Sequence, residues 1–145
     1  MRQCSYKIGV HIELLEPGNY HTILRGRIGG APVRIVLDTG ASHTCLDAHF
    51  FHQVTPDIPV QSFEGINAGI GGNDFSVQLV DMPDFRLGHF RLPLYKGLAL
   101  LDLSYINQGY QLLRKKPIQM ILGNDFLIEH HAVISYKDNT LTFTK

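Results

Sequence analysis

The 145-residue sequence contains no tryptophan, only two cysteines and no long hydrophobic run. Cys4 and Cys45 do not form a CxxC pair, so we expect free thiols and neither a disulfide framework nor a cysteine-bound zinc ion. No apolar stretch approaches the roughly 20 residues of a membrane-spanning helix, and the N-terminal segment has no signal-peptide core. These features predict a cytoplasmic protein that does not act on a membrane.

The chain also lacks an excess of charge, because 13 basic residues balance 13 acidic residues. A protein that binds a polyanion usually needs a basic surface, so this balance argues against nucleic acid as a partner. The length is sufficient for one hydrophobic core and too short for two. We therefore predict a single domain over residues 1–145.

The most informative stretch runs from Ile35 to Ser42, where an apolar strand ends abruptly in Asp38, Thr39 and Gly40. A carboxylate at the end of a buried strand is costly unless it is hydrogen-bonded or shares its site with another ionisable group. A structural interpretation is an Asx turn, in which Asp38 bonds its own downstream backbone. The alternative is that Asp38 carries out chemistry.

The motif Asp38-Thr39-Gly40-Ala41-Ser42 resembles the active-site loop of the aspartic proteases, and its single copy in a short chain resembles the retropepsin-like members. Two further segments occur in that family's order. Gly69-Ile70-Gly71-Gly72 lies where the family carries its glycine-rich flap, and Ile121-Leu122-Gly123, followed by Asn124, resembles the second half of its signature. The resemblance extends over nearly the whole chain, from Ile23 to Phe143.

The resemblance implies an all-β, closed retropepsin-like barrel with a flap hairpin over the substrate. Asp38 is the expected catalytic residue, supported by the loop around Ala41. Thr39 is expected to lock two loops together through its hydroxyl, Gly40 to let backbone amides approach the acids, and Ser42 to bond the outer carboxylate oxygen.

Peptide hydrolysis by carboxylates needs two acids, one as base toward a water and one as acid toward the carbonyl. This chain has one Asp-Thr-Gly, and Asp125 is a poor second acid because it follows Gly123 into an expected helix and matches a structural position of the family. We therefore predict a homodimer with two copies of Asp38 on its twofold axis. The predicted partners are a second copy and a peptide or protein substrate, and no cofactor is expected.

The remaining pattern predicts mainly strands with one or two short helices. The expected strands cover residues 8–14, 20–28, 33–37, 75–79, 85–101 with a turn at Gly88-His89, 118–122, and 132–136 with 141–143 as a terminal hairpin that turns at Asp138-Asn139. Residues 33–37 are apolar on both faces except for Arg34, so we expect this strand to be central. Expected helices run from Asp102 or Ser104 to about Leu113, and from an Asn124 cap to Glu129 or His130. The segment 45–51 is compatible with a short strand or a helical turn, a loop follows it, and the basic run 114–117 is interpreted as a solvated turn and not a binding patch.

Two other functions remain as alternatives. A non-catalytic peptide-binding or dimerisation module would keep the same fold, although a decayed site would be expected to lose its acid or glycine first. His43, His49 and His52 near Cys45 suggest a metal-dependent hydrolase. Histidines without a repeated short spacing are more often solvated or hydrogen-bonded, which disfavours the metal site.

Overall fold

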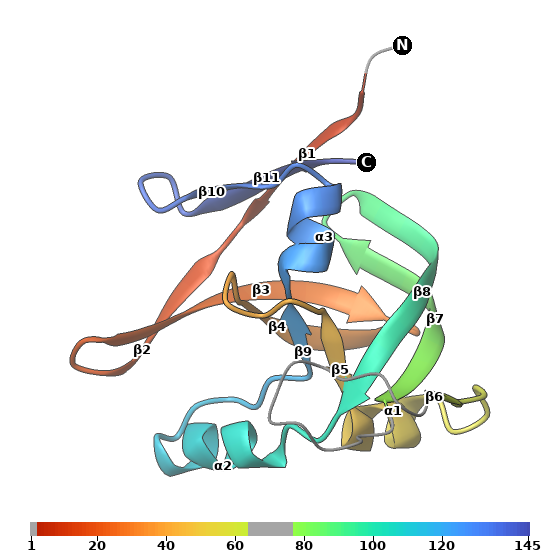
Figure 1. Ribbon diagram of the computed structural model, residues 1–145. Helices are drawn as coiled ribbons and strands as arrows, with labels where there is room; N and C mark the ends of the chain where they lie inside the picture. The colour runs from red at the N-terminus through yellow and green to blue at the C-terminus, as the bar shows by residue number, and fades with distance from the viewer. Residues whose placement is uncertain (1–2, 64–76) are drawn as a thin grey trace.

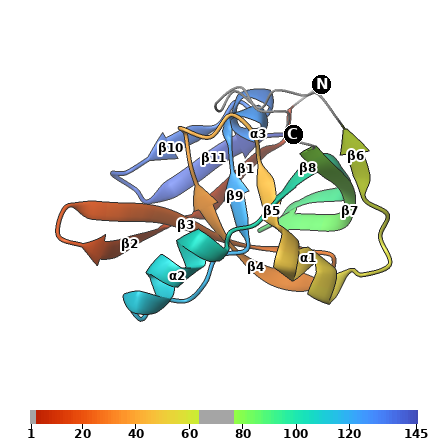
Figure 2. The same cartoon turned by 60° about the horizontal axis from the view of Figure 1, so that its bottom comes forward.

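The computed structural model describes residues 3–63 and 77–145, and its centre is a closed barrel of mixed strands (Figures 1 and 2). The order around the barrel is β3 (Asn19–Ile28), β4 (Ala31–Leu37), β9 (Met120–Leu122), β5 (Cys45–Asp47), β8 (Phe90–Leu101) and β7 (Val77–Leu87). Pairing of Arg27 with Arg86 joins β3 to β7 and closes the ring. The predicted closed β-barrel is therefore confirmed.

Strand β4 is central, as its apolar sequence predicted, because β3 pairs with one edge and β9 runs parallel along the other. Val33, Ile35 and Leu37 alternate into the main core of the barrel. Val36 on the opposite face belongs to a second apolar cluster outside the barrel wall. Full burial of such a side chain contributes roughly 1.5–3 kcal/mol, so two-sided packing fixes the strand that carries Asp38.

The two ends of the chain form a separate antiparallel sheet of β1 (Ser5–Gly9), β11 (Thr140–Thr144) and β10 (Val133–Ser135), at the top of Figure 1. The terminal hairpin was predicted, whereas the first strand differs from its prediction. The predicted strand over residues 8–14 is divided at Val10, whose N–H donates to the carbonyl of Asn139 at 2.9 Å. The following strand, β2 (His11–Glu16), pairs with β3 instead of β11. One alternating pattern therefore serves two different sheets.

Three short helices accompany the strands: α1 (Ala48–Val54), α2 (Ser104–Leu112) and α3 (Asn124–Glu129). The segment 45–51 contains both of its alternatives, since β5 leads directly into α1 and the Asp47 carboxylate caps that helix through the N–H of Phe50. The predicted Asn124 cap is wrong, because Gly123 occupies the N-cap position and Asn124 is the first helical residue. Among the described residues, no helix has the length and apolar character needed to cross a membrane.

The strand β6 (Gln61–Phe63) pairs antiparallel with the start of β7, with Phe63 opposite Val77. The predicted flap residues Gly69, Ile70, Gly71 and Gly72 belong to residues 64–76, which lie outside the described residues. The flap therefore stays a prediction.

Candidate active site

Asp38 stands where β4 and β9 separate. Its N–H donates to the carbonyl of Leu122 at 3.0 Å, which is the last contact between the two parallel strands. The N–H of Gly40 then donates to Asp38 Oδ1 at 2.8 Å, and the N–H of Ala41 donates to the Asp38 carbonyl at 3.2 Å. The Asx turn of the structural interpretation is thus present. It uses one carboxylate oxygen and leaves Oδ2 without a hydrogen bond from any residue that the structure describes.

The start of α3 holds this loop from behind. The side-chain amide of Asn124 donates to the Thr39 carbonyl at 2.7 Å, and its backbone N–H donates to the Ala41 carbonyl at 2.8 Å. Gly123 lies against the loop so closely that a Cβ there would be 2.8 Å from the Ala41 oxygen and equally close to the backbone of His43. The structure thus brings the two sequence motifs together, and only glycine fits between them.

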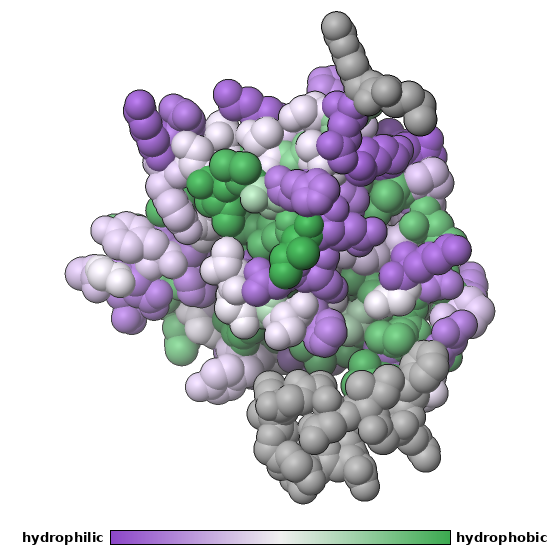
Figure 3. Space-filling view, turned by 45° about the horizontal axis from the view of Figure 1, so that its top comes forward, coloured by the Kyte–Doolittle hydropathy of each residue, from purple (hydrophilic) through white to green (hydrophobic). Residues whose placement is uncertain are grey.

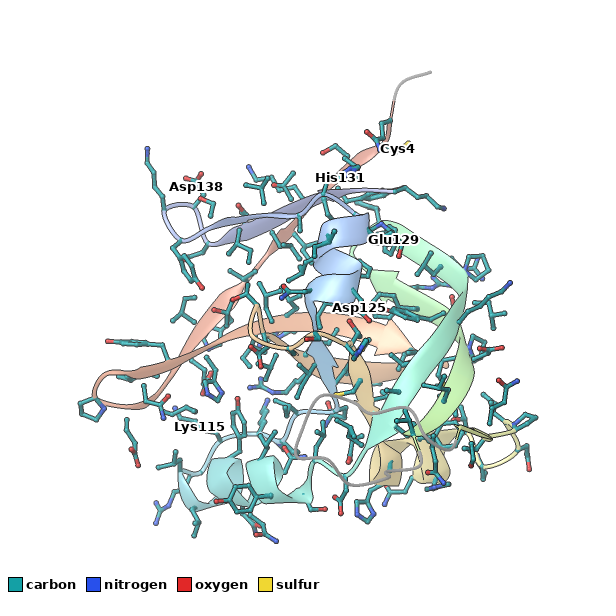
Figure 4. All side chains as sticks on the ribbon, viewed as in Figure 1. Cys4, Lys115, Asp125, Glu129, His131 and Asp138 are labelled. Atoms are coloured by element: carbon teal, nitrogen blue, oxygen red, sulfur yellow. The ribbon has the colours of Figure 1, made fainter. Side chains whose placement is uncertain are left out.

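Sequence reasoning missed Thr44, which connects the two motifs. Thr44 is buried, with 2% of its surface exposed. Its hydroxyl donates to Asp125 Oδ1 at 2.6 Å and accepts the N–H of Gly123 at 2.9 Å. The Asp125 carboxylate also accepts the N–H groups of Thr44 and Phe126 at 2.9 and 2.8 Å. Asp125 therefore has a structural task at the N-terminal end of α3 (Figure 4), and the hydroxyl two residues after the motif was the available signal.

Thr39, Gly40 and Ser42 are exposed beside the Asp38 carboxylate. Within the part of the chain that the structure describes, the hydroxyls of Thr39 and Ser42 make no hydrogen bond. Their predicted roles, between subunits and at the outer carboxylate oxygen, stay predictions. Ile121 and Leu122 flank the site from β9, with Ile121 paired to Cys45 and Leu122 directed into the core.

The thiol of Cys45 lies under the loop in the outer apolar cluster. Burial raises its pKa to about 11, and the negative charges of Asp125, Asp38 and Asp47 act in the same direction. The thiol is therefore neutral at physiological pH, and it is not a nucleophile for this site. Asp38, by contrast, is partly exposed.

The three histidines proposed as metal ligands do not come together. His49 Nε2 lies 3.5 Å from Asp102, while the His52 ring packs against Phe51. In residues 3–63 and 77–145 there is no group of three or more histidine, cysteine or acidic side chains that could hold a metal ion. The metal-dependent alternative therefore has no site among these residues.

Asp38 is thus a partly exposed carboxylate in a glycine-containing loop, at the point where two parallel barrel strands part. Such a carboxylate can act as a general acid or base. The sequence model of the aspartyl protease family matches residues 24–126, which include both motifs. The chain belongs to the retropepsin-like aspartyl protease family. No curated protein matches the sequence.

Solved structures support the fold. The retroviral protease-like domain of Ddi1 from Leishmania major is similar with a TM-score of 0.54 and 16% identity, over 83% of this chain and 86% of that one. A retropepsin-like aspartic protease from Rickettsia conorii also gives a TM-score of 0.54, with 10% identity, over 99% of this chain and 94% of that one. At these identities the likeness concerns the fold alone.

Proposed function

We propose that two copies of this chain form an aspartic endopeptidase whose catalytic pair is Asp38 from each subunit. The observation that carries the proposal is the Asp38 loop itself: the turn secures Oδ1, and no residue among 3–63 and 77–145 donates a hydrogen bond to Oδ2. A peptide would bind in extended form by main-chain pairing. One carboxylate would take a proton from the attacking water, while the other, protonated, would polarise the scissile carbonyl.

Two acids of the described residues that could have served as partners for Asp38 are already engaged, which supports a second copy. Asp125 is occupied by hydrogen bonds from Thr44 and Phe126, and Asp47 is buried, with its oxygens accepting the N–H groups of Leu103 and Phe50. Neither carboxylate is free to pair with Asp38. A twofold axis beside the Asp38 loop supplies the missing acid without any further residue.

Exposed apolar side chains support an interface next to this loop. Ile128 on α3 is 72% exposed and Val133 on β10 is 62% exposed. Figure 3 shows hydrophobic surface among hydrophilic surface on the face that carries the terminal sheet. Such patches commonly mark interfaces, and α3 begins at the active-site loop, so a symmetric contact here would bring the two loops together.

The decisive experiment compares wild type with Asp38→Asn on a mixed peptide library. The amide keeps the shape of the side chain but cannot act as a base, so activity should fall by at least 100- to 10,000-fold. Circular dichroism and urea unfolding should show an intact fold. An Asn variant that retains full activity would remove Asp38 from the mechanism, and an inactive wild type that still binds peptide would favour the non-catalytic module.

Mixing the two proteins tests the shared site. When wild type is equilibrated with an excess of Asp38→Asn, most wild-type chains enter heterodimers with one carboxylate and one amide, and activity should fall well below the wild-type fraction. Dilution below the dimer dissociation constant should also lower specific activity. A monomer in sedimentation that keeps its full specific activity would contradict the dimer.

A further inference from the structure

The outer wall of the barrel contains a cavity of about 400 Å³, remote from the Asp38 loop. This volume is within the range of small-ligand sites. Its lining includes three cationic residues, Arg25, Arg34 and Lys116, and no acidic residue; the others are Gly26, Pro32, Val33, Pro117 and Gln119. Arg34 precedes Asp38 by four strand positions, a separation of roughly 13 Å along β4. The cavity is therefore distinct from the proposed active site.

The cavity is built on a pair of like charges. Arg25 and Arg34 are direct partners across the antiparallel β3–β4 pair, where Cβ atoms lie about 4.5–5.5 Å apart. Like charges opposite each other destabilise such a pair. The Arg34 backbone is fixed on the other side, because its N–H donates to Gln119 Oε1 at 2.7 Å and its carbonyl accepts the Gln119 N–H at 2.9 Å.

The charges of this cavity are not neutralised by carboxylates of the described residues. Three cations elsewhere in the described chain do have such partners: Arg86 and Arg91 lie 2.8 and 2.9 Å from Asp84 Oδ1. Lys115, seen in Figure 4, lies 3.1 Å from Glu13 on β2, which also contacts His11. By contrast, Arg34 Nε is buried and has no hydrogen-bond partner among the described residues. Lys116 is exposed, as expected for a residue of a solvated turn, and it also lines this cavity.

We propose that this cavity binds a phosphate group, either as inorganic phosphate or as the headgroup of a small organic phosphate ester. A dianion between Arg25, Arg34 and Lys116 would offset the like-charge pair and accept hydrogen bonds from arginine, whose planar donors suit phosphate oxygens. A nearly neutral protein would then have a local anion site that is separate from catalysis.

Isothermal titration calorimetry of the full chain with sodium phosphate, and separately with glycerol 2-phosphate, at constant ionic strength tests the proposal. We expect saturable binding that Arg25→Gln weakens by about 10-fold or more, since hydrogen bonds to charged groups are worth about 1.5–3 kcal/mol. Lys116→Gln, outside any strand, should weaken binding similarly. Tighter binding of the ester would identify an organic phosphate, and equal or weaker binding would identify free phosphate; either result supports the site.

The matched control is Arg91→Gln, which removes the same charge from an arginine already paired with Asp84. Its phosphate affinity should stay within about twofold of wild type. Absence of saturable binding to wild type, or equal weakening by Arg25→Gln and Arg91→Gln, would overturn the proposal. Thermal unfolding without phosphate adds a second measurement: Arg25→Gln should keep or raise the Tm because it relieves repulsion, and a lower Tm would contradict the uncompensated pair.

Discussion

Replacing Thr44 with valine keeps the shape of a buried side chain but removes its hydroxyl. Two hydrogen bonds are lost, the 2.6 Å donation to the Asp125 carboxylate and the 2.9 Å acceptance from the Gly123 N–H. A hydrogen bond to a charged group is worth about 1.5–3 kcal/mol, and a buried N–H left without a partner costs about 1–3 kcal/mol. Thr44→Val should therefore lower the free energy of unfolding by about 3 kcal/mol, a large part of a typical total of about 5–15 kcal/mol.

Urea unfolding at one fixed protein concentration measures this loss, since dimerisation makes apparent stability depend on concentration. Two controls separate the hydroxyl from general effects. Thr44→Ser keeps both hydrogen bonds and should cost only about 1 kcal/mol for the lost methyl group. Thr22 is also buried but makes no side-chain hydrogen bond among the described residues, so Thr22→Val should be close to neutral. A Thr44→Val protein no less stable than Thr44→Ser would refute the role of the hydroxyl.

Further expectations concern the packing and titration of the site. Gly123→Ala should destabilise the fold by about 1–3 kcal/mol because its Cβ would meet backbone at 2.8 Å, while Gly109→Ala, in open space on α2, should be neutral or stabilising; equal urea midpoints for the two would refute the close approach. With the pKa of Cys45 near 11, iodoacetamide at pH 8 should label exposed Cys4 and spare Cys45 until the protein unfolds. The pKa of Cys45 is raised above the 9.0 of an ordinary thiol, so its contribution to the free energy of unfolding is fully present below pH 9 and declines toward pH 11. In urea unfolding, Cys45→Ala should therefore lose less stability than wild type between pH 9 and pH 11. Activity measured against pH should pass through a maximum and decline on both the acidic and the alkaline side. In aspartic proteases only the singly protonated pair supplies both a base and an acid, so activity that does not change with pH would contradict the shared proton. Chelators should leave activity unchanged, and loss with EDTA would revive the metal alternative.

Local pattern was sufficient for most of the elements. Two-sided apolar character identified β4 as a central strand, turn residues at Gly88-His89 located the β7–β8 hairpin, and Asp138-Asn139 located the β10–β11 hairpin. These features depend on neighbours in the chain and on whether a residue faces core or solvent, which sequence reports directly. The alternating pattern could not predict the break at Val10. The break arises because the residues before it pair with β11 and the residues after it pair with β3, in two different sheets.

The sequence by itself singled out Asp38 as the candidate catalytic residue and offered an Asx turn as the structure that holds it. Asp38 after an apolar strand, followed by Gly40, specifies an Asx turn through local backbone geometry. Only the tertiary structure decided how that loop is secured, through Thr44, Gly123, Asn124 and Asp125, and that Arg25 faces Arg34 beside Lys116. These contacts join residues about 80 positions apart or on different strands. They depend on register and close packing, which are set when the barrel closes and which no local pattern in the chain specifies as contacts.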